Sequence, residues 1–362
     1  MRPASEAEMA EAVAGATGPL AVRGGGTRGL LAEGAVLETG GLSGITLYEP
    51  GALTLVAQAG TPVAQIEAAL EAEGQMLAFE PMDHRGVLGS VGEPTIGGVV
   101  AANVSGPRRV APSGACRDCL LGVRFVDGLG QVIKNGGRVM KNVTGYDLVK
   151  LQAGAYGTLG VLTEVSLRVA PKPEASVTLV LEGLSLGDAV AAMSRGLTSP
   201  YQVTGAAHFG ERTLLRIEGF EGSVRYRAGQ LSAMFDGARI EEDAAGLWAQ
   251  VRDVSGFAGH DAVWRISTVP GRALEMVQGL DVDVMLDWGG GLIWVAARGD
   301  VAGLHGTLQQ RAARLGGHAT LVKTPDPALP RFQPEPAPVA RLTQGIRAKF
   351  DPRGILNLGI MG

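Results

Sequence analysis

The chain has 362 residues, of which 46% are hydrophobic and 19% are charged, a composition typical of ordinary globular proteins. A single hydrophobic core stops growing at about 250–300 residues, so the length predicts two domains. The formal net charge of −4 argues against a nucleic-acid partner, which would need a concentrated basic face.

The N-terminal region carries no sign of export or membrane insertion. Its first residues are acidic and amphipathic and lack an apolar signal core. No window approaches the roughly 18 uncharged apolar residues of a transmembrane helix. We therefore expect a cytoplasmic protein without a transmembrane segment, whose contact with a membrane would be peripheral.

The first half of the chain predicts helices alternating with short strands. Residues 4–17 should be helical, because Ser5 is a good N-cap ahead of regularly spaced apolar residues. Residues 61–73 predict a second helix, which Thr61 caps and Gly74 ends. Strands are expected at residues 19–22, 35–38, 54–57, 120–126, 131–133 and 162–169.

A domain boundary is predicted at Pro171 and Pro173, where two prolines interrupt the chain. Beyond them, strands and helices alternate in the order of two ferredoxin-like halves around one antiparallel sheet. Six prolines between residues 325 and 338 predict an extended linker, and residues 339–350 predict a final helix. In this half we expect strands at residues 177–181, 213–218, 263–267, 282–287, 292–297 and 318–323, and helices at residues 186–197, 224–235, 273–278 and 301–315.

The segment from Arg23 to Arg28 reads RGGGTR, and with Gly29 it fits the G-x-G-x-x-G spacing of dinucleotide-binding loops. A doubly wound dinucleotide fold places a long helix between that loop and the next strand. Here the next predicted strand begins at residue 35, which leaves no room for the helix, so we reject that fold.

The loop still has the chemistry of an anion site. Consecutive glycines expose backbone N–H groups with no side chain in the way. Arg23 and Arg28 flank them with guanidinium groups that suit phosphate oxygens, and Thr27 adds a hydroxyl. The alternative is a tight turn in a glycine-rich protein; the two arginines and the strand that enters the loop favour a diphosphate site.

Two cysteines, Cys116 and Cys119, stand in a C-R-D-C spacing that is found in redox pairs and in half of a metal site. A zinc or iron–sulfur site needs about four such ligands, and the sequence has no second pair. Because the second pair is missing, we expect Cys116 and Cys119 to be two reduced thiols and expect no metal site in this chain.

Four further segments are rich in small residues and follow one another along the chain. Residues 92–103 (GEPTIGGVVAAN) join small residues to a threonine hydroxyl, as a strand-to-helix turn against a flat ligand needs. Residues 113–122 (SGACRDCLLG), 139–147 (VMKNVTGYD) and 154–164 (GAYGTLGVLTE) come next. Taken in order with the glycine run, these segments resemble the vanillyl-alcohol-oxidase (PCMH-type) FAD-binding family.

This resemblance implies a fold and a cofactor. In that family the R-G-G-G-T run holds the pyrophosphate of FAD, T-I-G-G lies along the flavin, and the later motifs complete the pocket. The implied fold is α+β: a PCMH-type FAD-binding domain of two α/β subdomains over residues 1–172, a ferredoxin-like α/β cap over residues 173–330, and a segment over residues 331–362 that returns to the FAD domain. The residues that it assigns to FAD are Arg23, Gly24, Gly25, Gly26, Thr27, Arg28, Pro81, Thr95, Gly97, Gly98, Ala101, Arg117, Asp118, Gly122, Lys141, Tyr146, Gly160, Val161 and Asn357.

The C-terminal stretch FDPRGILN at residues 350–357 also matches the family, although its tail usually continues I-L-N-P-G and Leu358 stands here in place of the proline. Covalent flavin attachment in this superfamily uses a histidine in the glycine loop or a cysteine near the second motif. Thr27 and Glu93 occupy about those places, so we expect FAD to be bound non-covalently.

Within the family, residues 105–109 (SGPRR), the run VMKNVTGYDL and the short chain resemble the FAD-binding subunits of bacterial glycolate oxidases. This resemblance implies a complex with a larger FAD-binding catalytic subunit and an iron–sulfur subunit. The substrate of that complex is a small 2-hydroxy acid, glycolate, which is oxidised to glyoxylate. The FAD of this chain would relay electrons from the catalytic flavoprotein subunit towards the iron–sulfur clusters.

The catalytic residues stay unassigned. Oxidation of a 2-hydroxy acid needs a base for the hydroxyl proton and a cation for the carboxylate. Relatives that oxidise D-2-hydroxy acids commonly carry H-x-G-D-G-N in the cap, and none of the five histidines stands in that pattern. Two alternatives remain open: a self-sufficient FAD-dependent dehydrogenase with His84 or Tyr146 as its base, and a scaffold protein with a vestigial pocket.

Overall fold

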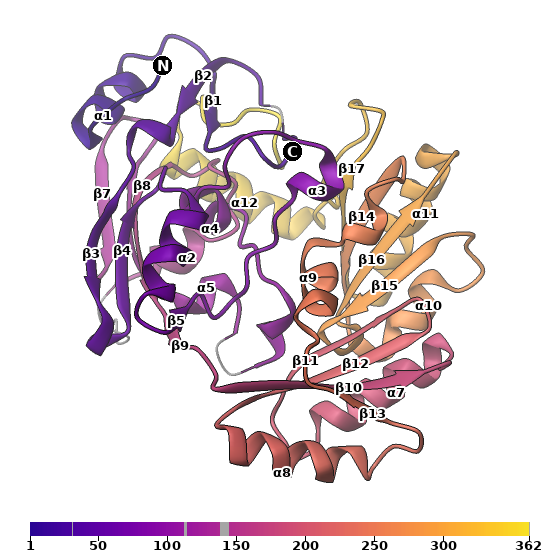
Figure 1. Cartoon of the computed structure of the whole chain (residues 1–362). Coiled ribbons are helices and arrows are strands. Elements are labelled where there is room, and N and C mark those ends of the chain that lie inside the picture. The colour runs from indigo at the N-terminus through magenta and orange to yellow at the C-terminus, as the bar shows by residue number, and fades with distance from the viewer. Residues whose placement is uncertain (31, 112–113, 138–144, 362) are drawn as a thin grey trace.

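The computed structural model describes residues 1–30, 32–111, 114–137 and 145–361. Two large sheets organise it, one of five strands and one of eight, and each carries its own set of helices (Figure 1). This mixture of helices and largely antiparallel sheets confirms the predicted α+β class.

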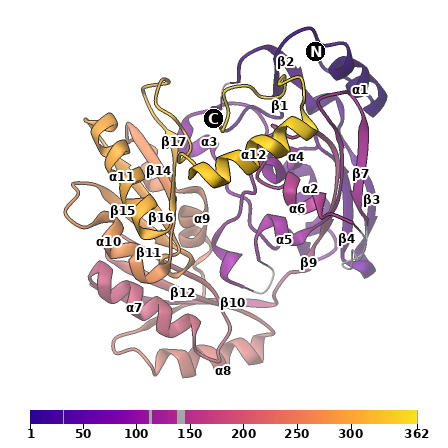
Figure 2. The same ribbon diagram turned by 180° about the vertical axis from the view of Figure 1, so that it is seen from behind.

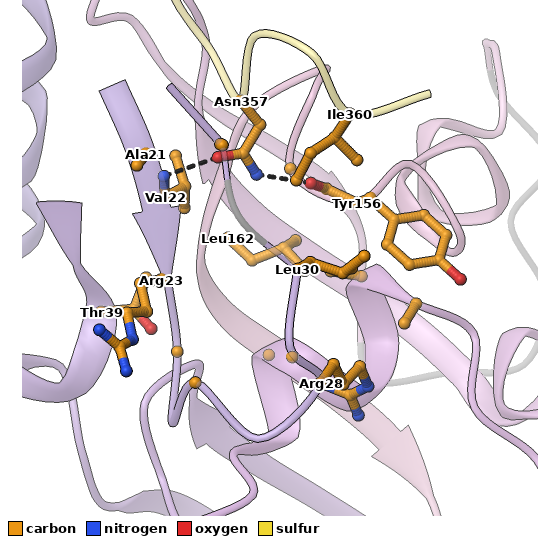
Figure 3. A pocket seen from close by; sticks show the side chains of 18 of the residues that line it. Ala21, Val22, Arg23, Arg28, Leu30, Thr39, Tyr156, Leu162, Asn357 and Ile360 are labelled. Carbon is orange, nitrogen blue, oxygen red and sulfur yellow. Dashed lines mark hydrogen bonds between the residues drawn. The ribbon is translucent and has the colours of Figure 1, made fainter. Parts of the chain in front are cut away.

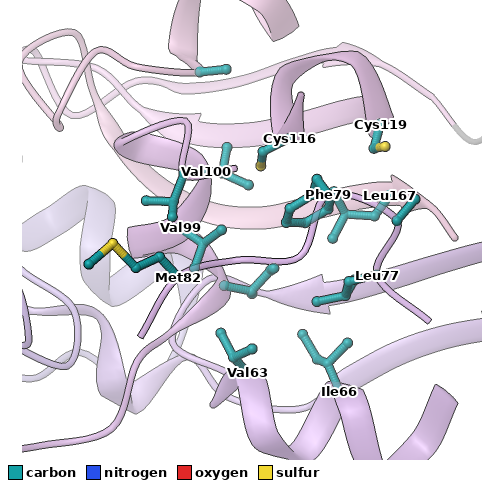
Figure 4. Close-up of a cluster of buried hydrophobic side chains, with 14 of the residues drawn as sticks. Val63, Ile66, Leu77, Phe79, Met82, Val99, Val100, Cys116, Cys119 and Leu167 are labelled. Carbon is teal, nitrogen blue, oxygen red and sulfur yellow. The ribbon is translucent and has the colours of Figure 1, made fainter. Parts of the chain in front are cut away.

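The five-stranded sheet has the order β3-β4-β8-β6-β7 and is antiparallel throughout. Helices α2 and α4 lie against it, and their apolar side chains, Ile66 and Val99 among them, meet those of the sheet in one buried cluster (Figure 4). The bounds are β3 Ile45–Glu49, β4 Thr54–Gln58, β6 Leu120–Val126, β7 Val132–Gly136, β8 Val161–Arg168, α2 Val63–Glu71, α3 Arg85–Leu88, α4 Ile96–Ala101, α5 Cys116–Cys119 and α6 Leu148–Gln152, with a small sheet of β5 Gln75–Met76 and β9 Ala170–Pro171.

The two cysteines belong to this buried cluster. Cys116 and Cys119 begin and end the single turn of α5, and both side chains are completely buried among apolar neighbours (Figure 4). Burial raises the pKa of the Cys116 thiol, so it stays protonated at neutral pH. Their position is that of packing residues rather than reactive ones.

The N-terminal helix and two short strands form a separate layer. Helix α1 (Glu6–Ala14) starts as predicted, because the Ser5 hydroxyl accepts a hydrogen bond from the Glu8 amide at 3.2 Å. Strands β1 (Leu20–Arg23) and β2 (Ala35–Glu38) pair in parallel. None of the described residues between them is helical, which confirms the absence of a dinucleotide-type crossover helix.

The predicted cap of the second helix is wrong. Helix α2 begins after Pro62, and no side chain caps it. The Thr61 hydroxyl instead donates to the Gln58 carbonyl at 2.7 Å and accepts from the Gly44 amide at 2.9 Å. Thr61 is completely buried, so its hydroxyl serves the nearest unpaired backbone groups of the loop rather than the helix.

The eight-stranded sheet has the order β13-β10-β12-β11-β15-β16-β14-β17. Each group of four is a β-α-β-β-α-β unit with ferredoxin-like strand order, and the two units join edge to edge through β11 and β15, which confirms the predicted pair of halves. Helices α7, α8, α10 and α11 cover one face (Figure 1). The bounds are β10 Ala175–Glu182, α7 Leu186–Leu197, β11 Val203–Phe209, β12 Arg212–Gly219, α8 Glu221–Ser232, β13 Arg239–Glu241, α9 Ala245–Asp253, β14 Ala262–Ser267, α10 Ala273–Val277, β15 Asp283–Asp287, β16 Leu292–Ala297, α11 Val301–Leu315 and β17 His318–Lys323.

Two bidentate ion pairs join the halves of the molecule. Arg108 donates to the Glu218 carboxylate of β12 at 2.7 and 3.1 Å. Arg216, also on β12, donates to Glu80 with both nitrogens at 2.9 Å. Because each pair is buried and fork-to-fork, it fixes how the eight-stranded sheet sits on the rest of the chain.

The proline-rich segment between β17 and the last helix contains no helix or strand, but it is not the extended linker predicted: it turns back at residues 326–329 and packs against the eight-stranded sheet. The Leu321 amide donates to the Arg331 carbonyl at 2.8 Å, and Phe332 stacks edge-on against Tyr156 at 4.9 Å between ring centroids. Helix α12 (Ala337–Phe350) then runs from the region of β17 back towards β1 (Figure 2). We propose a division into domains after residues 172 and 330, because the eight-stranded sheet lies between these positions and the tail then returns to β1.

Candidate functional site

The glycine loop lines a cavity of about 250 Å³, which we call the glycine-loop cavity (Figure 3). Its walls come from β1 and the loop at residues 24–30, from the first turns of α4, from residues 152–162, and from the C-terminal tail. It is therefore built from the N-terminal part of the chain and closed by the last few residues.

Close packing explains why the loop is made of glycines. A Cβ at Gly25 would lie 1.6 Å from the Glu93 carbonyl oxygen, and a Cβ at Gly92 would lie 2.2 Å from the Gly25 oxygen. The loop thus rests directly on the backbone that leads into α4. Gly26 has a φ of +70°, and the Arg23 guanidinium covers the side on which a Cβ would project, at 2.4 Å.

Arg28 is the more buried of the two arginines that line this cavity. Its Nε is buried without a hydrogen-bond partner, and none of the described residues forms an ion pair with its guanidinium. Burial lowers the pKa of Arg28, and the nearby Tyr156 partly opposes this shift. A buried guanidinium N–H without a partner is costly, so this position favours an anionic ligand.

Asn357 holds three segments together at the edge of the cavity. Its Oδ1 accepts from the Val22 amide of β1 at 2.6 Å, and its Nδ2 donates to the Tyr156 carbonyl at 2.6 Å (Figure 3). Its own amide donates to the Leu20 carbonyl, so the tail adds to β1. Asn357 has a φ of +47°, a conformation that a following proline would disfavour and that Leu358 permits.

A second cavity, of about 280 Å³, lies between the eight-stranded sheet and the N-terminal half, and we call it the inter-sheet cavity. Arg28, Ala102 and Tyr156 line both cavities, so the two meet at these side chains. The far wall consists of side chains on the face of the eight-stranded sheet that its helices leave uncovered, Arg265 and Trp294 among them.

The ionisable side chains of the inter-sheet cavity are strongly perturbed. Burial lowers the pKa of His84 to about 3, and the charge of Arg28 adds to this shift, so the imidazole is neutral at pH 7. Burial raises the pKa of Asp287 to about 7, although the Trp288 amide donates to its carboxylate at 2.7 Å. A carboxyl group with a pKa near 7 is suited to proton transfer at physiological pH.

Most of the residues assigned to FAD meet at the glycine-loop cavity. Those that line it are Arg23, Gly24, Gly25, Gly26, Thr27, Arg28, Gly97, Gly98, Ala101, Gly160 and Asn357. Thr95 and Val161 stand directly behind this lining: the Thr95 hydroxyl caps α4 by accepting from the Gly98 amide, and Val161 is buried in the core around α1. Pro81 is buried next to Met82, which lines the inter-sheet cavity.

Four of the other assigned residues, Tyr146, Arg117, Asp118 and Gly122, line neither cavity. Tyr146 is 85% exposed, and its backbone carbonyl accepts from the Asn135 amide group, so neither a cofactor contact nor a catalytic base is placed there. Arg117 is exposed, and Asp118 accepts from the Ala115 amide at the start of α5. Gly122 serves strand packing, since a Cβ would meet the Gly137 carbonyl at 2.6 Å. Lys141 lies outside the described residues.

The residues that sequence reasoning missed are Arg265 and Asp287 of the eight-stranded sheet and Tyr156 of the junction. The signal for the first two was alternation: on β14, Arg265 faces the cavity and Trp264 and Ile266 face the helices, and on β15 Asp287 faces the cavity and Leu286 faces the helices. Such a pattern marks the two faces of a strand without saying which face a second sheet will cover.

The residues present fit FAD: a glycine cradle that a Cβ would fill, an unpartnered arginine behind it, and a second cavity continuous with the first. Residues 1–136 match the family described as FAD binding domain. Two structures of alkyldihydroxyacetonephosphate synthase share the fold, with TM-scores of 0.71 and 0.68 at 14% identity over 99% of this chain and 75% and 76% of theirs. Fold and site thus define a flavoprotein with a PCMH-type FAD-binding domain.

The family can be stated more closely. The glycolate oxidase subunit GlcE of Escherichia coli (strain K12) is 38% identical over 348 residues, 95% of this chain and 92% of that protein. The glycolate oxidase subunit GlcD of Bacillus subtilis (strain 168) is 35% identical over 169 residues, 45% of this chain and 34% of that protein. The chain belongs to the GlcE family of glycolate oxidase subunits. None of its helices, over the ranges described, is long and apolar enough to cross a membrane.

Proposed function

We propose that this chain is the FAD-binding subunit of a glycolate dehydrogenase complex, an FAD-dependent oxidoreductase that acts on the CH–OH group of a small 2-hydroxy acid. The observation that carries the proposal is the glycine loop with unpartnered Arg28, opening on a cavity in a chain 38% identical to a glycolate oxidase subunit over 95% of its length. The names of the GlcE and GlcD relatives, both subunits of a glycolate oxidase, support an assembly of several chains.

The cofactor is FAD, held without a covalent bond. The backbone amides of residues 24–28 and the Arg28 guanidinium neutralise its diphosphate, and Asn357 keeps the walls of the cavity in place. Thr27 and Glu93 offer no histidine or cysteine for covalent attachment. When bound, the flavin accepts electrons in pairs and passes them on singly.

The partners are a larger FAD-binding catalytic subunit and an iron–sulfur subunit. In this arrangement the flavin of the present chain relays electrons from the catalytic flavoprotein towards the clusters. The chain works in the cytoplasm and reaches the inner membrane only peripherally, through its partners. Its own two cysteines are packed in the core of the five-stranded sheet, so the clusters are assigned to another subunit.

The test is a comparison of the purified chain with the complex. The full chain should bind FAD yet reduce a dye acceptor with glycolate only when the partner subunits are added. Copurification from cells should yield the catalytic and iron–sulfur subunits with it. Robust glycolate turnover by the isolated chain would overturn the relay role.

The inter-sheet cavity favours a second candidate, a self-sufficient FAD-dependent dehydrogenase of another small alcohol or 2-hydroxy acid. Asp287 offers a proton acceptor with a pKa near 7, a role for which His84 is too weakly basic. In that case Asp287→Asn should abolish turnover by the isolated chain, whereas in the relay role the isolated chain has no turnover to lose.

A further inference from the structure

We propose that the inter-sheet cavity binds a small monocarboxylate, a 2-hydroxy or 2-oxo acid of two or three carbons, with Arg265 as its carboxylate anchor. The proposal rests on the proposed function for the choice of acid. It adds that this chain holds such an acid itself, at a site whose far wall is formed by the cap strands.

The sheet register places Arg265 in the wall of the cavity. On β14 it lies opposite Trp294 of β16 and Thr320 of β17, and all three side chains line the cavity. The residues that flank Arg265 on its own strand, Trp264 and Ile266, are buried on the other face, beneath the helices. Arg265 thus projects from an inner strand that is hydrogen-bonded to a neighbour on each side.

The positive charge of Arg265 has no anionic partner among the described residues. No hydrogen bond or ion pair to its guanidinium is found among these residues, although its carbon lies 5.1 Å from the centroid of the Trp288 ring. Burial lowers the pKa of Arg265, because the guanidinium charge loses solvation in the cavity wall. The ring fixes the orientation of the guanidinium and leaves its N–H groups available to a carboxylate.

The charge balance of the cavity favours an anion. Three arginines line it, and one of them, Arg252, is paired with Asp253. That leaves Arg28 and Arg265, against Asp287 as the only lining carboxylate of the described residues. His84 is neutral at pH 7 and adds no competing charge.

The cavity has room for a small acid, and the one unpaired cation that the described residues place on its cap side suits one carboxylate. The cavity of about 280 Å³ is far above the roughly 10–15 Å³ that one water needs, and part of it borders the glycine-loop cavity. Apart from Arg265 the wall is mixed: Leu292, Val322 and Phe332 are apolar, and Ser105, His318 and Thr320 are polar. Since Arg28 already faces the cofactor cavity, a single cation remains on the cap side, which suits one carboxylate and a short apolar or hydroxylated carbon.

The test uses calorimetric titration of glycolate into the full chain purified with its FAD, with neutral glycolamide as the ligand control. Glycolate should bind and glycolamide should not. Arg265→Met should weaken glycolate binding about 10- to 100-fold, because a charged hydrogen-bonded pair is lost. Arg109→Met is the matched control: Arg109 lies 5.8 Å from the same Trp288 ring but does not line the cavity, so affinity should not change.

Flavin absorbance and circular dichroism are recorded for every variant. If Arg265→Met does not fold, Arg265→Lys, which keeps the charge but loses the planar fork, should bind glycolate about tenfold more weakly. Absence of glycolate binding to the yellow wild-type chain, or equal binding by wild type and a folded Arg265 variant, would overturn the anchor while leaving the FAD subunit intact. A colourless chain would refute the FAD subunit instead, and titration of that chain would still test the anchor.

Discussion

The glycine-loop cavity takes the largest continuous part of its lining from β1 and the glycine loop, whereas the inter-sheet cavity combines residues of the N-terminal half with side chains on strands β14 to β17. In the first, Gly25 and Gly92 touch through their backbones, so the residue types are dictated by local contact. In the second, Arg265 and Asp287 acquire their environment only when two sheets are docked. The first cavity can therefore be predicted from the sequence. The second cannot, because it forms only where the eight-stranded sheet packs against the N-terminal half.

The largest effect on stability is expected where the eight-stranded sheet contacts the N-terminal half. Arg216→Met leaves the buried Glu80 carboxylate without its bidentate partner. Removing one member of a buried ion pair typically costs about 3–5 kcal/mol, so the free energy of unfolding should fall by that order. Chemical denaturation followed by circular dichroism measures it; the solvent-exposed pair variant Arg225→Met, in α8, should change it very little. If Arg216→Met lowered the free energy of unfolding no more than Arg225→Met does, the ion pair between Arg216 and Glu80 would not hold the two halves together.

The packing of the glycine loop gives the next effect. Gly25→Ala places a methyl group against the Glu93 carbonyl and must push the loop off the residues before α4. Overpacking of this kind costs about 1–3 kcal/mol, which corresponds to roughly 5- to 150-fold weaker FAD binding if the strain falls on the bound state. Gly86→Ala is the control, because a Cβ there meets open space and its φ is ordinary. Fluorescence titration with FAD would reveal the difference, and wild-type affinity in Gly25→Ala would contradict the packing argument.

The two arginines of the loop differ in burial and should differ in effect. Arg28→Met removes the buried, unpartnered cation and should weaken FAD binding by about 1.5–3 kcal/mol. Arg23 is exposed and rests on Gly26, so Arg23→Met should weaken binding by about threefold or less. The same titration decides the ranking. If Arg23 proved the more important of the two, the cavity-side assignment of Arg28 would be wrong.

Asp287 provides the most specific prediction, because it depends on pH. Its pKa is about 7 in the folded chain against 3.8 as the ordinary value, so between these values the folded state binds one proton more than the unfolded state. Stability should therefore fall as pH rises from about 4 to 7, by at most about 1.4 kcal/mol per pH unit. Asp287→Asn should remove this slope and be the more stable form above pH 7.

The electrostatic setting of Asp287 involves both halves of the molecule. The negative charge of Glu80 raises its pKa further, whereas the Trp288 amide and the charges of Arg216 and Arg265 lower it. Urea unfolding at a series of pH values compares the variant with the wild type. Parallel pH profiles would show that Asp287 ionises normally and that the inter-sheet cavity is wetter than its geometry indicates.

The sequence predicted the cap topology because each strand and helix there has a clear period and the order repeats. It predicted the glycine loop because Arg23, the glycines and Arg28 act within six consecutive residues. It failed for Thr61, whose hydroxyl bonds to a loop instead of capping a helix. The assignment of Tyr146 to FAD stays a prediction, for a side chain that is exposed in this structure. Arg265 could not be predicted, since an alternating strand does not say which face another sheet will cover.

The central claim is that bare amides and Arg28 hold FAD without a covalent bond, and purification of the full chain tests it most directly. The account predicts a yellow protein that carries one FAD per chain and releases it on acid precipitation. A colourless chain that takes up no added FAD, or a flavin that stays with the precipitated polypeptide, would contradict it.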